Sequence, residues 1–200
     1  MPDPISIAIV AEDELSMAVA ERIVDASGRS FVVSRRLVER GFGNIKRSIK
    51  KYRQASHVVP HLVLADLDRT ECPALLRRQW YAEDLPGSML FRVAVREIES
   101  WILGDCSGFA RFASIATNKV PVAPEILSDP KGVLIGLVRR SRNRRLAAEM
   151  VPAHGSSVPI GPLYNERLGS FVRDRWNLET AAGACPSLKR MQARLITFLV

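Results

Sequence analysis

Residues 61–68 read HLVLADLD, and this stretch decides the fold class. Residues 62–65 form an apolar run after His61, as is typical of a strand buried in a parallel sheet. Asp66 and Asp68 close the run, at the carboxyl end where open α/β sheets place their ligands. Because side chains alternate along a strand, both carboxylates are expected to start on the same side. Their hard oxygen atoms favour Mg²⁺, although an aspartate here can instead cap the next helix.

A second strand end carries another acidic residue, Glu12. Residues 5–10 are apolar and partly β-branched, as in a strand, and apolar residues recur with helical spacing over residues 15–24. Glu12 therefore lies in a strand-to-helix turn. The preference for negative charge in the first turn of a helix explains Asp13 and Glu14, but it explains Glu12 less well.

A third acidic stretch, residues 91–105, reads FRVAVREIESWILGD and contains Glu97, Glu99 and Asp105. Residues 91–95 read as a strand, and a helix that begins near Glu97 would place Glu97, Trp101 and Asp105 on one face. Two acids beside a large aromatic residue favour a functional site. The structural alternative is a core Trp101 flanked by solvated acids.

The composition is that of an ordinary globular protein, with 200 residues of which 47% are hydrophobic and 25% charged. No apolar run approaches the roughly 18 residues of a membrane span, and the N-terminus lacks the basic region of a signal peptide. Three scattered cysteines argue against a disulfide framework or a zinc site and favour a reducing cytosol. We therefore expect a cytoplasmic protein with no membrane partner.

Strands and helices alternate over the first part of the chain, which predicts a parallel sheet with helices on both faces. We expect strands at residues 5–10, 31–33, 61–65 and 90–95, within an α/β domain of residues 1–116. A proline-rich connector at residues 120–124 then leads into a mostly helical C-terminal subdomain, residues 117–200. Its helices are expected at residues 131–138, 163–176 and 188–199.

The positive net charge, +8 with a pI near 9.9, makes a polyanionic partner plausible. Two segments concentrate this charge: a basic helix that follows the glycine loop at residues 41–43, and an arginine cluster whose planar guanidinium groups suit phosphate oxygens. The structural alternative for each segment is a solvated helix face. The candidate nucleic-acid-binding residues are Lys46, Arg47, Lys50, Lys51, Arg139, Arg140, Arg142, Arg144 and Arg145.

The acidic positions carry a resemblance to a known fold. Glu12 after the first strand and the pair Asp66 and Asp68 after a later one resemble the signature of the Toprim fold. The chain is more closely similar to a family of small bacterial Toprim-like proteins known as DUF4276, through residues 11–16, 64–68, 96–105, 129–131 and 187–188. This resemblance covers nearly the whole chain, and residues 96–105 are its most specific part.

The resemblance implies a Rossmann-like core and a nuclease that cleaves phosphodiesters, DNA in preference to RNA, with Mg²⁺ or Mn²⁺. Glu12, Asp66 and Asp68 would be catalytic metal ligands, with Glu12 as general acid or base. Glu97, Glu99 and Asp105 would help to hold a second ion, so that two ions clamp the attacking and leaving oxygens. Relatives with this fold, such as the OLD-family nucleases, often work beside an ABC-type ATPase in defence against phage. An oligomer is compatible with this picture.

The sequence departs from the wider Toprim pattern at two positions: Asp13 stands where a glycine is common, and Ser16 where nuclease relatives often carry an acid. Two other classes therefore stay open. One is a catalytically silent partner subunit of an ATPase. The other is a phosphoreceiver switch, which would need a hydroxyl and a lysine, whereas the sequence offers Arg96 and Glu97 after the strand.

Overall fold

The computed structural model describes residues 3–81 and 84–199. Its sheet contains four parallel strands in the order β2-β1-β3-β4, which confirms the predicted α/β class. The strands are β1 (Ile5–Ala11), β2 (Phe31–Val38), β3 (His61–Asp66) and β4 (Met89–Ala94). The chain moves outward in one direction from β1 to β2 and in the other from β3 to β4. The boundary between β1 and β3 is therefore the topological switch point of the sheet.

The two central strands match the sequence prediction closely because burial on both faces demands a continuous apolar run. All six residues of β3 are buried, as are the last five of β1. The edge strand β2 is longer than the predicted residues 31–33. The polar run Ser34-Arg35-Arg36, which a solvated edge tolerates, concealed its second half from the apolar pattern.

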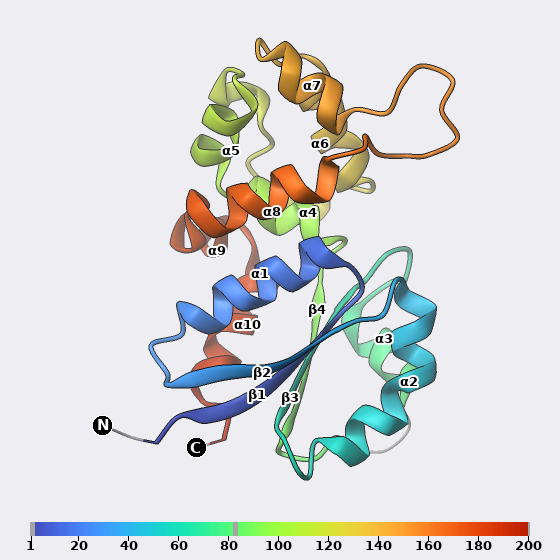
Figure 1. Ribbon diagram of the computed structural model, residues 1–200, viewed down its shortest axis with the longest axis vertical. Coiled ribbons are helices and arrows are strands. Elements are labelled where there is room, and N and C mark those ends of the chain that lie inside the picture. Colours follow the sequence, from blue (N-terminus) through green and yellow to red (C-terminus); the bar gives the residue numbers. More distant parts are fainter. Residues whose placement is uncertain (1–2, 82–83, 200) are drawn as a thin grey trace. The chain divides into compact units, whose positions relative to one another are not determined.

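Helices cover both faces of the sheet, as predicted. Helices α1 (Glu14–Asp25) and α10 (Pro186–Ile196) lie on one side, and α2 (Phe42–Ala55) and α3 (Pro73–Trp80) lie on the other (Figure 1). Ile45 and Ile49 of α2 and Trp80 of α3 pack with Val63 and Phe91 of the sheet in one buried cluster. Burial of these side chains is the main driving force that holds the layers together.

The chain forms two compact units, and they do not divide it at residue 116. The first unit comprises the chain up to Val95 and again from Ser187, whereas the second is Arg96–Pro186. Within the second unit α4 packs against α6 and α9. Its helices are α4 (Ile98–Gly104), α5 (Cys106–Ala113), α6 (Pro130–Arg139), α7 (Arg144–Met150), α8 (Tyr164–Asp174) and α9 (Leu178–Ala184), with short 3₁₀ turns at Thr117–Lys119 and Pro124–Ile126.

The boundary differs from the predicted one because α4 follows β4 directly in the sequence and so looks like the next step of the strand–helix alternation. The last helix, α10, instead returns to the first unit, where the Ser187 hydroxyl lies 3.4 Å from the backbone nitrogen of Val95. Arg29 of the same unit donates to the backbone carbonyl of Phe198 at 3.2 Å. In the described part of the chain, no helix combines the length and the apolar character that crossing a bilayer requires.

Candidate metal centre

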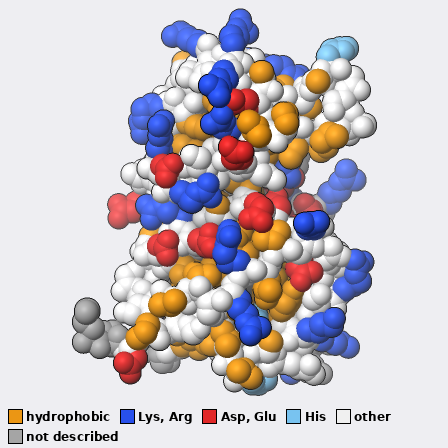
Figure 2. All heavy atoms as spheres, viewed as in Figure 1, with side chains coloured by type: hydrophobic (Ala, Val, Ile, Leu, Met, Phe, Trp, Pro, Cys, Tyr) orange, Lys and Arg blue, Asp and Glu red, His pale blue; other side chains and the backbone are white. Residues whose placement is uncertain are grey.

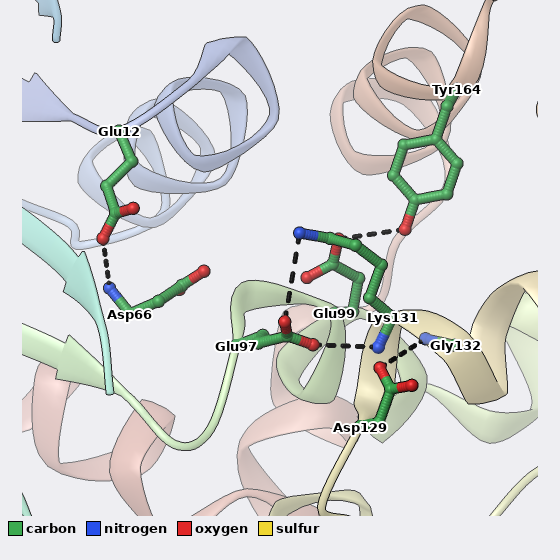
Figure 3. Close-up of polar contacts among 8 residues, drawn as sticks. All are labelled: Glu12, Asp66, Glu97, Glu99, Asp129, Lys131, Gly132 and Tyr164. Carbon is green, nitrogen blue, oxygen red and sulfur yellow. Dashed lines mark hydrogen bonds and ion pairs between the residues drawn. The ribbon is translucent and has the colours of Figure 1, made fainter. Parts of the chain in front are cut away.

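The side chain of one predicted acidic residue, Glu12, contacts the backbone of another, Asp66, at the switch point. The Glu12 carboxylate accepts a hydrogen bond from the backbone N–H of Asp66, with 2.8 Å between Oε1 and N (Figure 3). Glu12 directly follows β1 and Asp66 ends β3, so the contact joins the carboxyl ends of the two central strands. This is the edge of an α/β sheet at which ligands bind. Asp66 is 9% exposed and Glu12 is partly buried.

The loop after β2 also contacts Glu12. The backbone N–H of Gly41 donates to the Glu12 carbonyl at 3.1 Å, and that of Glu39 donates to the Ala11 carbonyl at 3.0 Å. Gly41 has φ +124°, which residues with a side chain rarely adopt. The glycine thus lets the chain turn beside Glu12 and begin α2, and no side chain of the described residues caps the first turn of that helix.

Asp68 lies beyond the strand. Strand β3 ends at Asp66, and Asp68 is exposed with φ +48°, in the left-handed region that aspartate tolerates better than most residues. The alternation of side chains along a strand therefore does not set the direction of Asp68, contrary to the sequence argument. Asp68 instead lies in the turn that leads away from the sheet edge.

The two departures from the Toprim pattern form one local contact. Asp13 is the N-cap of α1, and its carboxylate accepts from the backbone N–H of Ser16 at 2.8 Å. An aspartate cap satisfies one of the unpaired N–H groups at the start of a helix. Asp13 is thus accounted for by helix capping, a more specific role than the general preference for negative charge that its sequence position indicates, and Glu12 remains the acid that contacts the neighbouring strand.

A second acidic cluster lies in the second unit, around Glu97 and Glu99. The backbone N–H of Lys131, in the first turn of α6, donates to Glu97 Oε2 at 3.0 Å. The ammonium group of Lys131 lies 4.0 Å from Glu97 Oε1 and 3.6 Å from Glu99 Oε1. Tyr164 of α8 donates its hydroxyl proton to the same Glu99 oxygen at 2.9 Å (Figure 3). Lys131 and Tyr164, which lie 32 and 65 positions further along the chain, thus complete the surroundings of Glu99.

Burial dominates the electrostatics of Glu99. Its side chain is 1% exposed, and the loss of solvation raises the pKa of its carboxyl to about 7. The Lys131 cation opposes this rise in pKa, and the nearby Glu97 carboxylate adds to it. Within the described residues the second carboxylate oxygen of Glu99, Oε2, is buried without a hydrogen-bond partner. Glu99 is therefore poised to gain or lose a proton near neutral pH.

Asp105 has a structural role in the same unit. One of its carboxylate oxygens accepts from the backbone N–H of Gly108 at 2.9 Å, which caps α5, and the other accepts from that of Asn177 at 2.9 Å, just before α9. Asp105 is 1% exposed. Trp101 is fully buried, as the structural alternative for this helix expected, but Glu99 and Asp105 are buried as well and not solvated, contrary to that alternative. Whether Asp105 can also hold an ion stays a prediction.

The predicted nucleic-acid-binding residues lie on the surface. All four lysine and arginine candidates of α2 are exposed, opposite the buried Ile45, Ile49 and Tyr52. The arginine cluster spans the turn from the end of α6 to the start of α7, and all five of its arginines are exposed. In the view of Figure 2, Lys and Arg side chains gather over the part of the second unit that holds α5 and α7.

The donor chemistry of Glu12, Asp66 and Asp68 suits a hard cation, since all three side chains offer carboxylate oxygens. In the described residues, no group of three or more His, Cys, Asp or Glu side chains is arranged to hold a metal ion. Comparison of the chain with protein-family models, curated proteins and solved structures finds no match.

Proposed function

We propose that this protein is a divalent-metal-dependent phosphodiesterase acting on nucleic acid. The observation that carries the proposal is the 2.8 Å contact between the Glu12 carboxylate and the Asp66 backbone, at the switch point of a parallel sheet. The carboxylate at the end of one central strand contacts the backbone at the end of the other, and a buried or partly buried carboxylate at such an edge is a candidate functional group.

Each acid has a distinct part in this proposal. Asp66 and Asp68 would supply the carboxylate oxygens for Mg²⁺ or Mn²⁺, which would activate the phosphodiester as a Lewis acid when bound. The hydrogen bond from the Asp66 backbone fixes Glu12 in place at the strand end. Glu12 would act as general acid or base, because a positioned carboxylate can pass a proton to or from the reacting oxygens.

The charge of the protein supports nucleic acid as the substrate. The exposed cations of α2 follow the Gly41 turn, which is itself bonded to Glu12, so a phosphate backbone bound along α2 would approach the switch point. Neutralisation of phosphates by Lys and Arg supplies most non-specific affinity for nucleic acid. We favour DNA over RNA. The resemblance to Toprim-like proteins adds an ABC-type ATPase partner and a role in phage defence to the proposal.

The test is a nicking assay on supercoiled plasmid with Mg²⁺, with Mn²⁺ and with EDTA. We expect relaxed and linear products only with metal, and none from Asp66→Asn, because asparagine keeps the shape of the side chain but lacks the charge that holds a hard cation. The matched control is Asp13→Asn. This change removes the same charge next to Glu12, yet asparagine caps a helix as well as aspartate does, so cleavage should persist.

A second measurement separates binding from cleavage. Millimolar Mn²⁺ should raise the melting temperature of the wild type and of Asp13→Asn but not that of Asp66→Asn, since an ion that binds only the folded site stabilises it. Full cleavage by a purified Asp66→Asn protein would rule out the catalytic role.

A catalytically silent partner subunit is the second candidate. It is favoured by the bond between Glu12 and Asp66 itself, because a carboxylate that ties β1 to β3 has a purely structural use. On this alternative Mg²⁺ and Mn²⁺ would leave the melting temperature of the wild type unchanged, and an ATPase partner would bind the wild type and Asp66→Asn equally well.

A further inference from the structure

A cavity of about 340 Å³ lies in the second unit, away from Glu97 and Glu99. Its walls come from α5, α7 and α8 and include Phe112, Arg145, Glu149, Arg167, Phe171 and Arg175. The volume falls at the lower end of the range of roughly 300–1,000 Å³ that is usual for small-molecule sites.

Three arginines and one glutamate give this cavity a positive charge. Arg145 Nε donates to Glu149 Oε1 at 2.9 Å, and Arg167 Nε donates to Glu149 Oε2 at 2.6 Å. Both bonds use Nε, and among the described residues the terminal amino groups of the two arginines have no hydrogen-bond partner, so these groups remain for a ligand. The glutamate therefore orients the two guanidinium groups, Arg167 at 33% exposure more firmly than Arg145 at 83%, which lowers the entropy lost when a ligand binds.

Arg175 indicates that the arginines form a ligand site and do not merely link two helices. The bonds to Glu149 alone would explain Arg145 and Arg167 as links that join α7 to α8. Arg175 also lines the cavity, but it is exposed and makes no ion pair with the described residues. A third cation turned to a cavity that already holds two arginines fits an anion with several oxygens, such as a phosphate.

The remaining wall is aromatic. The rings of Phe112 and Phe171 stack with their centroids 4.8 Å apart and their planes at 29°. Phe171 is buried, whereas Phe112 is partly exposed and lines the cavity. A planar base can stack on such a ring, and this contact tolerates any base.

We propose that this cavity binds a nucleotide, with the phosphate held by Arg145, Arg167 and Arg175 and the base against Phe112. The nucleotide is either free or part of a strand, since both present the same phosphate and base. The site goes beyond the proposed function, because it uses neither Glu12, Asp66 and Asp68 nor a metal.

The test is calorimetric titration of the full chain in EDTA, which chelates divalent metal and so prevents any metal-dependent cleavage. The probes are adenosine 5′-monophosphate, adenosine, inorganic phosphate and a short single-stranded oligonucleotide with or without a 5′-phosphate. We expect the monophosphate to bind at least about tenfold more tightly than adenosine, because charge-assisted bonds to phosphate supply much of the affinity. Tighter binding of the phosphorylated oligonucleotide than of the monophosphate would identify a strand as the source, and the reverse would identify a free nucleotide.

Arg175→Gln should weaken binding of the monophosphate about tenfold. The matched control is Arg173→Gln, which removes the same charge from an exposed arginine of α8 that does not line the cavity, and it should leave binding unchanged. Phe112→Leu should weaken the monophosphate about fivefold or more but spare inorganic phosphate. Failure of the monophosphate and both oligonucleotides to bind, or equal losses in Arg175→Gln and Arg173→Gln, would overturn the proposal. Neither result bears on plasmid nicking.

Discussion

The Glu12 carboxylate accepts a hydrogen bond from the backbone N–H of Asp66, a residue 54 positions further along the chain. The bond couples the two strand ends that an α/β sheet offers to a ligand. It also fixes the side chain of Glu12 before any substrate arrives. A proposed catalytic acid is thus also a structural link, and the two roles predict different consequences of substitution.

Removal of this link should destabilise the protein. Glu12→Ala leaves the Asp66 N–H without its acceptor, and hydrogen bonds to charged groups contribute about 1.5–3 kcal/mol. We expect a loss of this size in the free energy of unfolding, measured by urea denaturation without metal. Glu12→Gln keeps an acceptor oxygen and should lose less. The control Glu14→Ala removes an exposed acid whose 3.5 Å ion pair with Arg36 contributes little, and it should be near neutral. Equal stability of Glu12→Ala and Glu14→Ala would contradict the structural role.

If the arginine cluster binds DNA, it should contribute to the salt dependence of the affinity for DNA. If Arg139, Arg140 and Arg144 contact phosphates, changing all three to glutamine should flatten the dependence of log K on log salt concentration by up to about three units. The measurement is fluorescence anisotropy with labelled duplex DNA between low and moderate salt. The control triple variant replaces Arg111, Lys119 and Arg173, which are also exposed and lie in the same unit, with glutamine and should keep the slope. Identical slopes in both triple variants would mean that the cluster is a solvated surface that does not contact phosphates.

The sheet and the strand-end positions of Glu12 and Asp66 could be predicted from the sequence because local patterns encode them. Burial on both faces requires the apolar runs that end at Ala11 and Asp66, and the parallel order then brings the two strand ends together. The edge strand β2 was underestimated, because solvent on one side permits the polar Ser34-Arg35-Arg36 run. Prediction from the local pattern failed at β2 because a strand at a solvated edge does not need a continuous apolar run.

The surroundings of Glu99 could not be predicted, because they depend on tertiary contacts. Lys131 and Tyr164 carry no local signal that would link them to an acid 32 or 65 residues away. The short helices α5, α7 and α9 escaped prediction for a related reason: with seven or eight residues each, they show too little periodicity to be recognised. The same limit hid the cavity, whose walls come from three helices.

Two aspartates offer a comparison of cap strength. Asp105 and Asp129 each accept a bond from a glycine N–H three residues later, but only Asp105 is buried and bonded also to the Asn177 N–H. Asp129→Ala should cost about 1 kcal/mol, the usual loss for an N-cap. Asp105→Ala leaves two N–H groups without acceptors in the interior and should cost roughly 2–4 kcal/mol. Urea denaturation of the two variants measures the difference, and equal losses would show that the second bond of Asp105 contributes nothing.

The protonation of Glu99 should make stability depend on pH. Its pKa in the folded protein, about 7, lies above the ordinary value of 4.5, so the folded protein binds this proton more tightly than the unfolded chain does. The resulting stabilisation is complete below pH 4.5 and is lost as pH rises through 7. A shift of this size corresponds to a change on the order of 3 kcal/mol.

Replacement of Glu99 by glutamine should remove that dependence. Glutamine resembles the protonated carboxyl and can still accept the Tyr164 hydrogen bond, so Glu99→Gln should match the wild type at pH 5. At pH 8 the wild type carries a buried charge that Lys131 compensates only in part, and the variant should be more stable by about 2–3 kcal/mol. Urea denaturation at pH 5, 6, 7 and 8 measures both profiles. The exposed Glu166→Gln serves as the control and should follow the wild type at every pH. Parallel profiles for the wild type and Glu99→Gln would mean that Glu99 stays ionised over this range, held by the Lys131 cation.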